Sequence, residues 1–214
     1  MGVEFVDLFD KWASSYDDTV SGVDPEYKEV FEGYDNMLAE VASLAVSPVL
    51  EFGIGTANLT QKIVAEGKMA VGIEPSREMR KIATVKCPEA AIYEGDFMQY
   101  PNLLPFNSII SSFAFHHLTD TEKNKAIAGY SAMLKPGGTV LFLDTLFASK
   151  EEKSKIINEA KEKGFMNLYK DLNEEYYPFQ DDLRYMFEQN NFDVTFKRKN
   201  KFAWLIQATK KENG

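Results

Sequence analysis

The sequence contains a single cysteine, Cys87, among its 214 residues. An internal disulfide and a cysteine-based zinc site are therefore excluded, and the composition is typical of a reducing compartment. The sequence has no apolar run of about 18 residues, as a membrane helix would need. Its first residues, among them Glu4 and Asp7, lack the basic start and apolar core of a signal peptide. We therefore expect a cytoplasmic protein without a membrane span.

A surplus of positive charge is also missing. The net charge is −9, and residues 1–40 carry all of it, with eleven acids and two bases. A nucleic-acid binder needs a cationic face for the phosphates, and the one basic cluster is typical of a solvated hairpin tip: Lys197, Arg198, Lys199 and Lys201. We expect no nucleic-acid partner. The acidic start of the chain favours neutral or cationic small molecules over acidic ones.

The first part of the chain has the apolar spacing of helices. One helix is predicted over residues 4–20, with an apolar face formed by Phe5, Leu8, Phe9, Trp12 and Tyr16. A second is predicted from Pro25 to Ala45, because proline favours the first turn of a helix. Since the apolar face of the first helix must be buried, we expect these helices to form a cap that opens and closes over a ligand site.

Beyond Pro48, short apolar runs alternate with helical stretches. Strands are predicted at 49–52, 69–73, 90–93, 108–113 and 139–143, and helices at 57–66, 76–86 and 120–134. This alternation indicates right-handed βαβ units and a parallel sheet. After a helical insertion at 151–177 and a helix at 179–189, strands at 192–199 and 202–209 are too close for a crossover, so they should form an antiparallel hairpin. We expect one domain: a cap (1–46), a core (47–148), an insertion (149–178) and a C-terminal helix with its hairpin (179–214).

A glycine-rich segment follows the first strand. In Val49-Leu50-Glu51-Phe52-Gly53-Ile54-Gly55-Thr56-Ala57-Asn58-Leu59, two glycines allow a tight turn and the close approach of a nucleotide-type ligand to a helix N-terminus. A plain βα turn is the alternative. The dinucleotide pattern G-x-G-x-x-G would need glycine at position 58, which is Asn58, and this disfavours NAD or FAD.

Acidic residues end the next two strands. Glu74 lies 19 residues after Gly55, where this topology places a carboxylate beside a ribose; alternatively it supplies charge at a helix N-terminus. The third strand ends in Glu94-Gly95-Asp96-Phe97, whose carboxylate and ring suit an adenine.

Together these motifs resemble a class I S-adenosylmethionine-dependent methyltransferase of the small-molecule type. The resemblance spans essentially the whole chain, from Trp12-Ala13-Ser14-Ser15-Tyr16-Asp17 through the glycine turn to Phe115-His116-His117-Leu118 and Leu134-Lys135-Pro136-Gly137-Gly138. More narrowly, the chain is similar to the YrrT-like bacterial methyltransferases, whose genomic setting suggests sulfur amino-acid recycling. Ala57 departs from the family pattern, which has a third glycine there.

The resemblance implies a fold and a cofactor site. The fold is α/β, a Rossmann-like, seven-stranded, mostly parallel sheet with an antiparallel C-terminal hairpin and an N-terminal helical cap. S-adenosyl-L-methionine is the implied cofactor: Gly53 and Gly55 meet its methionine end, Glu74 holds the ribose, and Asp96 and Phe97 frame the adenine. Of the aromatic residues in the cap and the insertion, Tyr16 is the one expected to touch the cofactor.

Strand four provides the candidate catalytic residues. The family's macromolecular amide and ring-amine methyltransferases carry Asn-Pro-Pro-aromatic there, whereas this chain has Ser112-Phe113-Ala114-Phe115 followed by His116 and His117. Ligands bind outside the carboxyl ends of strands, so either histidine could deprotonate a methyl acceptor. Alternatively they cap the next helix or pack beneath the cap. We expect no metal, because side chains of neighbouring histidines usually diverge.

Three further alternatives remain at this stage. Asp144, after strand five, either contacts the substrate or lies in a solvated turn. The protein as a whole could be a nicotinamide-dependent oxidoreductase, which Asn58 and the hairpin disfavour, or a non-catalytic cofactor-binding regulatory protein.

Overall fold

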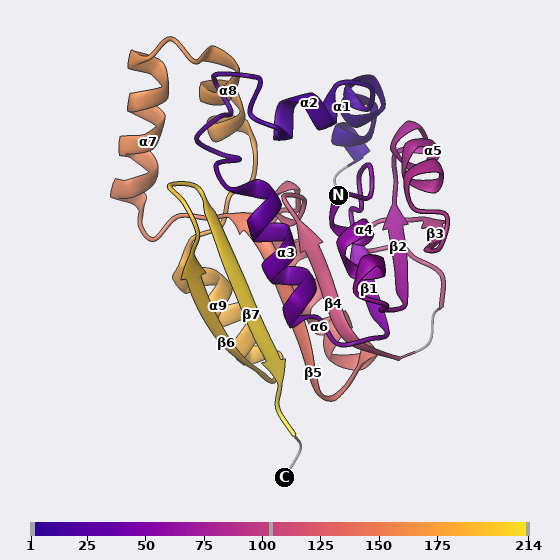
Figure 1. Ribbon diagram of the computed structural model, residues 1–214. Helices are drawn as coiled ribbons and strands as arrows, with labels where there is room; N and C mark the ends of the chain where they lie inside the picture. Colours follow the sequence, from indigo (N-terminus) through magenta and orange to yellow (C-terminus); the bar gives the residue numbers. More distant parts are fainter. Residues whose placement is uncertain (1–2, 103–104, 213–214) are drawn as a thin grey trace.

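The computed structural model describes residues 3–102 and 105–212 and is built around a seven-stranded sheet (Figure 1). Its strand order is β3-β2-β1-β4-β5-β7-β6. The strands are β1 (Val49–Phe52), β2 (Ala70–Glu74), β3 (Ala91–Glu94), β4 (Phe106–Ser112), β5 (Leu134–Thr145), β6 (Phe192–Arg198) and β7 (Ala203–Lys210).

The pairing of the strands confirms the predicted fold class. The ladders among β1, β2, β3, β4 and β5 are parallel, and β7 runs antiparallel to both β5 and β6. The sheet is thus Rossmann-like and mostly parallel, with the expected antiparallel hairpin at one edge. The carboxyl ends of the parallel strands meet at one side, which is where open α/β sheets bind ligands.

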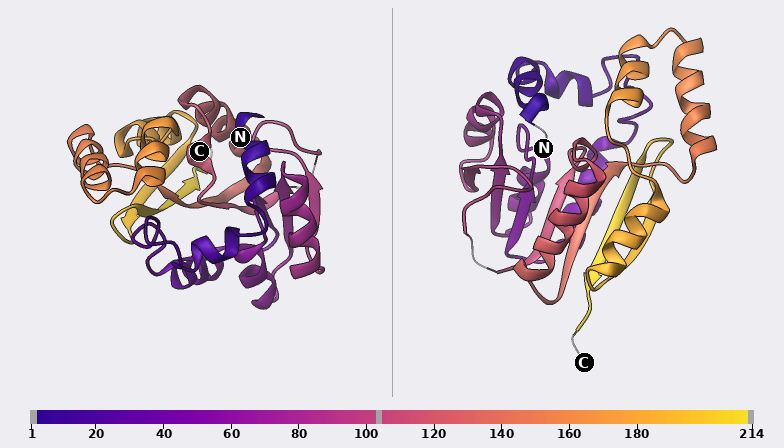
Figure 2. Two further views of the ribbon diagram at one scale, coloured as in Figure 1. Left: turned by 90° about the horizontal axis from the view of Figure 1, so that it is seen from above. Right: turned by 180° about the vertical axis from the view of Figure 1, so that it is seen from behind.

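Helices cover both faces of the sheet and its carboxyl-end side (Figure 2). On one face α3 (Tyr34–Leu44) and α4 (Asn58–Ala65) pack over Val49 and Leu141; on the other, α6 (Asp120–Met133) and α9 (Gln180–Gln189) pack over Leu50 and Phe142. α5 (Arg77–Lys86) flanks β2 and β3. Beyond the carboxyl ends lie α1 (Val3–Trp12), α2 (Tyr16–Val20), α7 (Lys150–Glu162) and α8 (Met166–Glu174). In the described ranges 3–102 and 105–212, no helix combines the length and apolarity that crossing a membrane requires.

The structure corrects the predicted first two helices. The helix predicted over 4–20 breaks into α1 and α2, and Ser15 donates from its backbone and side chain to the carbonyl of Trp12 at 3.0 and 3.3 Å. Such local bonds of serine compete with helix propagation. The second helix begins at Tyr34 rather than Pro25, because Asp24 accepts the Glu26 N–H in a turn and Gly33 takes a left-handed φ of 78°.

A carboxyl group is buried within β1. Glu51 is 1% exposed; its Oε2 accepts the Thr60 hydroxyl at 2.7 Å, and among the described residues its Oε1 has no hydrogen-bond partner. Burial raises the pKa of Glu51 to about 8, with the charge of Glu74 also raising it and the Thr60 bond opposing. Because the folded-state pKa exceeds the ordinary value of 4.5, the folded state binds this proton more tightly than the unfolded chain does.

We predict that Glu51→Gln changes the pH dependence of stability. The contribution of the protonated Glu51 to the free energy of unfolding is complete below pH 4.5 and is lost as the pH rises to about 8. The loss is on the order of 3–5 kcal/mol. The free energy of unfolding of the variant, measured with urea, should therefore rise relative to that of the wild type between pH 5 and pH 8.5. Glu89→Gln, at an exposed position, is the control and should follow the wild type. Parallel curves for Glu51→Gln and the wild type would contradict the assignment.

Candidate functional site

The glycine turn between β1 and α4 is tightly constrained. Gly53 has a φ of 65°, and a Cβ added there would lie 2.7 Å from the Ala114 Cβ, so glycine is required. Gly55 has a φ of 53°, and the Tyr16 ring lies 3.8 Å from the position of its added Cβ. Ala57, the N-cap of α4, also has a left-handed φ of 70°. Alanine therefore stands here in a backbone conformation that favours glycine.

Glu74 faces this turn from the end of β2. Its side chain is 2% exposed; Oε2 accepts the Gly55 N–H and Oε1 the Ser76 N–H, both at 2.9 Å. Burial raises the pKa of Glu74 to about 7, against the lowering effect of these two bonds. The N-cap of α5 is Ser76, whose hydroxyl accepts the Met79 N–H. Ser76 thus caps α5, while Glu74 bonds both the glycine turn and the N-cap residue of α5, so the structure is compatible with both roles considered for this carboxylate.

Asp96 and Phe97, which follow β3, make different kinds of contact. Asp96 Oδ1 accepts the backbone N–H groups of Met98 and Gln99 at 2.6 and 2.8 Å, which fixes the turn after β3. Phe97 is 2% exposed and stacks on Phe52 with ring centroids 5.3 Å apart. The ring supports the glycine turn from the core.

The N-terminal cap closes over the glycine turn. A cavity of about 20 Å³ is bounded by Phe9 and Tyr16 of the cap and by Gly53, Gly55 and Glu74 of the turn. Pockets for small molecules measure about 300–1,000 Å³, so the cap must move for a nucleotide-sized ligand to bind. The requirement for glycine at position 53 arises from Ala114, which fills the space of a Cβ. The buried Glu74 carboxylate at the glycine turn nevertheless fits a ligand that offers hydroxyl groups.

Two cap carboxylates hold it in this position. Asp10 Oδ1 accepts the Ser76 hydroxyl at 2.5 Å, near the start of α5. Asp17 accepts the Thr56 hydroxyl at 2.6 Å and pairs with the Lys86 ammonium at 2.9 Å, near the start of α4. These polar contacts act together with apolar packing, because Phe9 and Ala13 of the cap are buried against Met79 of α5.

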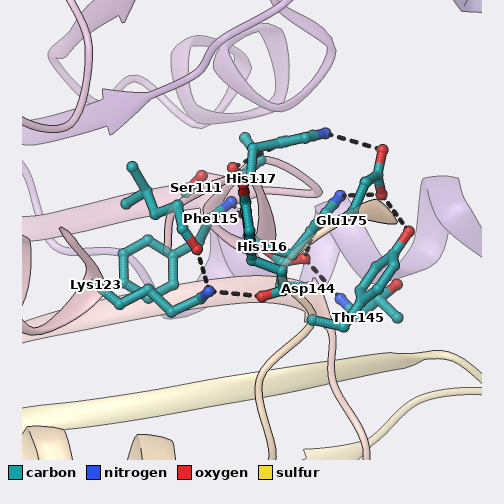
Figure 3. Close-up of polar contacts among 12 residues, drawn as sticks. Ser111, Phe115, His116, His117, Lys123, Asp144, Thr145 and Glu175 are labelled. Atoms are coloured by element: carbon teal, nitrogen blue, oxygen red, sulfur yellow. Dashed lines mark hydrogen bonds and ion pairs between the residues drawn. The ribbon is translucent and has the colours of Figure 1, made fainter. Parts of the chain in front are cut away.

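His116 and His117 lie on a short 3-10 turn after β4 (Figure 3). His116 Nδ1 bonds Asp144 Oδ1 at 2.5 Å, and His117 Nδ1 bonds the carbonyl of Ala114 at 3.1 Å. Because both partners can only accept, each Nδ1 carries a proton. Contrary to our expectation the rings do not diverge: their centroids are 4.1 Å apart. Nor does either histidine cap α6, whose N-cap is Thr119 in a capping box with Glu122.

Glu175, which sequence reasoning did not identify, lies opposite both histidines (Figure 3). Its Oε2 is 3.4 Å from His116 Nε2, and its Oε1 is 3.4 Å from His117 Nε2. The Tyr177 hydroxyl donates to Glu175 Oε2, and the Tyr177 ring stacks on His116 with a centroid distance of 4.8 Å. The only signal in the sequence was the run Glu174-Glu175-Tyr176-Tyr177 in the insertion.

Burial and charge give the two histidines different pKa values. Burial lowers the pKa of His116, but the charge of Asp144 and its bond outweigh this effect, so the net shift is upward. Burial lowers the pKa of His117, and the neighbouring His116 charge lowers it further. Burial raises the pKa of Glu175, but its contacts with the histidines reverse the shift. The pair thus consists of the His116 imidazolium and the neutral His117 imidazole beside the Glu175 carboxylate.

Asp144 and Lys123 support this cluster. Asp144 is 2% exposed and accepts the N–H groups of Phe115 and Thr145 at 2.8 and 2.7 Å, which contradicts a solvated turn. The fully buried Lys123 ammonium donates to the carbonyl groups of Leu118 and Tyr176. It therefore joins the segment after the histidine turn to the loop that carries Glu175.

A second cavity, of about 60 Å³, lies over the histidines. Its walls include His116, His117, Glu175 and Asp171. Phe9, Tyr16 and Phe113 line both this cavity and the one at the glycine turn. The two cavities therefore adjoin beneath the cap.

Known proteins share this sequence and this fold. Residues 49–138 match the family model described as "Methyltransferase domain". "Uncharacterized methyltransferase YrrT" of Halobacillus halophilus is 59% identical over 99% of this chain and 100% of its own length. "Uncharacterized methyltransferase OB1106" of Oceanobacillus iheyensis is 49% identical over 98% of this chain and 99% of its own.

Solved structures show the same fold at low identity. Magnesium protoporphyrin IX methyltransferase (ChlM) from Synechocystis PCC 6803, solved with bound SAH, has a TM-score of 0.69 at 14% identity, covering 95% of this chain and 98% of its own. From its sequence relatives, its fold and its glycine turn, the chain belongs to the YrrT-like family of class I S-adenosylmethionine-dependent methyltransferases.

Proposed function

We propose that the protein transfers the methyl group of S-adenosylmethionine to a small-molecule acceptor held over His116 and His117. The observation that carries this proposal is the wall that the two cavities share, made of Phe9, Tyr16 and Phe113. A cofactor bound at the glycine turn would have its reactive end beside a pocket that holds two imidazoles and a carboxylate. The family assignment supports a methyltransferase, in place of the oxidoreductase and the regulatory protein that were the alternatives from the sequence.

The cofactor contacts are proposed residue by residue. Gly53 and Gly55 allow the methionine end to approach the backbone, and Glu74 accepts the two ribose hydroxyls once the cap has opened. Tyr16, whose ring lies over Gly55, covers the sulfonium, where an aromatic face stabilises positive charge. Asp96 and Phe97 remain proposed neighbours of the adenine, with Phe97 acting from beneath because its ring is buried.

Enclosure and charge support a small neutral or cationic acceptor. The cavity over the histidines lies under the cap and is lined by the carboxyl groups of Glu175 and Asp171, which disfavour an anion. The basic residues of the hairpin make no free cationic face, since Lys197 and Lys199 pair with Glu40 and Lys201 pairs with Glu29. We therefore propose a small neutral or cationic metabolite and no nucleic-acid partner. That this metabolite is cytoplasmic and linked to sulfur amino-acid recycling, with no membrane partner, is proposed from the resemblance to the YrrT-like methyltransferases.

The mechanism assigns limited tasks to the protein. S-adenosylmethionine, when bound, supplies an electrophilic methyl group on a sulfonium. The acceptor must be aligned for in-line displacement and shielded from water, which the closed cap and the aromatic walls do. The acceptor also loses a proton. Of the two candidate catalytic residues, His117 is the proposed base because it is the neutral imidazole, and the His116 imidazolium lies beside it.

Glu74→Ala should weaken S-adenosylhomocysteine binding. Hydrogen bonds to a charged group contribute about 1.5–3 kcal/mol each, so the dissociation constant should rise roughly tenfold to a few hundredfold. Calorimetry measures this constant directly. The matched control is Glu94→Gln, because Glu94 is the register partner of Glu74 on the neighbouring strand; its affinity should stay near the wild-type value. Unchanged affinity of a folded Glu74→Ala protein would contradict the ribose assignment.

Replacement of the catalytic histidine should affect turnover and spare cofactor binding. A panel of metabolites, with release of S-adenosylhomocysteine as the readout, identifies the acceptor. On that acceptor, His116→Asn or His117→Asn should lower the rate by about 10²-fold or more, with little change in cofactor affinity. Tyr176→Phe, on the adjacent loop and 40% exposed, serves as the control. Full activity in both histidine variants would make the histidines structural.

Hydrogen exchange should report the opening of the cap. Residues 5–20 should exchange more slowly when S-adenosylhomocysteine is added, and more so than α9, because elements that open for a ligand have low local stability without it. Asp17→Ala should speed exchange of the ligand-free cap about fivefold, the effect of losing roughly 1 kcal/mol of hydrogen bonding. Asp18→Ala, at the exposed neighbouring position, should not. Equal exchange with and without ligand would make the cap a fixed part of the core.

A further inference from the structure

The imidazoles of His116 and His117 meet the Glu175 carboxylate with their Nε2 atoms. One ligand atom from each of the three residues can be chosen so that all lie within 4.8 Å of one another. All three side chains are largely inaccessible, with side-chain exposures of 7%, 4% and 11%. They come from two distant segments, the turn after β4 and the loop after α8, so the arrangement exists only in the folded chain.

The hydrogen bonds on the far side of each ring set the direction of its lone pair. Each Nδ1 carries its proton toward a fixed acceptor, Asp144 Oδ1 for His116 and the Ala114 carbonyl for His117. In the neutral imidazole of His117 the lone pair is then on Nε2 and faces a carboxylate oxygen, whereas the His116 imidazolium must release its Nε2 proton before it can bind a metal. An acceptor facing an acceptor in a dry site is unfavourable unless a proton or a cation lies between them. An Nδ1–H that donates to a carboxylate or carbonyl is also how metal-binding histidines are oriented.

The spacing favours a metal ion over direct hydrogen bonds. Charge-assisted N–H···O bonds are about 2.7–2.9 Å long, whereas both Nε2–carboxylate distances are 3.4 Å. Bonds of about 2.0–2.1 Å to a tetrahedral zinc ion place neighbouring ligand atoms about 3.3–3.4 Å apart. The two distances reach different oxygens of Glu175, and the three candidate ligand atoms lie within 4.8 Å of one another, so metal binding would require the side chains to rotate toward a common centre.

We propose that His116, His117 and Glu175 bind a divalent transition metal ion of the zinc class. Two imidazoles and one carboxylate match the His₂Glu set of zinc sites that keep a fourth position open, while calcium and magnesium prefer sites made entirely of oxygen atoms. This proposal replaces the expectation of no metal, which assumed that the two rings diverge.

The surroundings suit a dication. Glu175 and the adjacent Asp144 carboxylate supply two negative charges, and the Tyr177 hydroxyl holds Glu175 in place. Phe5 and Phe9 cover the His117 ring with centroids at 4.9 and 5.1 Å, which excludes water from that side. The open position would face the cavity that adjoins the glycine turn. This inference rests on the proposed function only in that the acceptor would reach this position. With both Nε2 atoms on the metal neither histidine would act as a base, and the bound metal would instead lower the pKa of the acceptor.

The histidine content of the chain allows a test on the wild-type protein. The sequence has two histidines, so an imidazole ¹H–¹⁵N spectrum reports this site alone. After treatment with a chelator, the full-length protein is titrated with Zn²⁺ alone. We expect both Nε2 resonances to shift and saturate at one equivalent, while Mg²⁺ alone leaves them in place. Imidazole resonances that do not respond to one equivalent of Zn²⁺ would overturn the proposal.

Variants then test the third ligand. Loss of a residue that only supports a metal ligand lowers metal affinity about 10- to 100-fold. Glu175 is proposed as a direct ligand, so Glu175→Gln should raise the Zn²⁺ dissociation constant at least about tenfold in calorimetry. Asp171→Asn is the matched control, because Asp171 lines the same cavity but bonds Tyr27; it should stay within about twofold of the wild type. A Zn²⁺ dissociation constant that is the same in Glu175→Gln and in the wild type would overturn the proposed site. Binding of S-adenosylhomocysteine is measured separately, so failure of the metal site and failure of the proposed function give different results.

Discussion

The buried carboxylate of Asp144 fixes the turn on which the acceptor side of the molecule depends. It accepts the backbone N–H groups of Phe115, His116 and Thr145 and the Nδ1–H of His116. Burying an ionised group is costly unless several donors surround it. A neutral or misplaced side chain here would leave donors unpaired in a dry region, so the conformation of the histidine turn is determined by the end of β5.

The N-terminal cap links the histidine turn to the glycine turn, which is the proposed cofactor site. Phe9 and Tyr16 line the cavities at both ends, and Asp10 and Asp17 reach the starts of α5 and α4. One segment therefore lines both cavities, and under the proposed function binding at the glycine turn would alter access to the histidines. The acidic character of the first 40 residues has a structural use as well, because several of these acids form the bonds that hold the cap and the hairpin tip.

Local sequence determined much of what was predicted correctly. Alternating strands and helices specify a parallel sheet, and the short link between the last two strands permits only a hairpin. Gly53 could be identified because a close backbone approach demands glycine. The broken first helix was missed because the apolar spacing continues across Ser14 and Ser15, while local serine bonds stop the helix there.

Contacts between distant segments could not be predicted in this way. Glu175 lies 58 residues after His117 in an irregular loop, and nothing in its neighbours indicates that it faces two imidazoles. Phe97 was expected at the same edge of the sheet as Asp96, but the direction of its ring depends on packing against Phe52, which its neighbours in sequence do not reveal. The division of the chain into a cap, a core, an insertion and a C-terminal unit stays a prediction.

A crystal structure of the complex with S-adenosylhomocysteine tests the central claim most directly, because that claim concerns one chamber shared by cofactor and acceptor. The account predicts the ribose hydroxyls on Glu74, Phe9 and Tyr16 displaced from the positions they hold here, and the sulfur directed toward the cavity of His117. A ligand with its sulfur directed away from that cavity, or bound elsewhere on the protein, would contradict it.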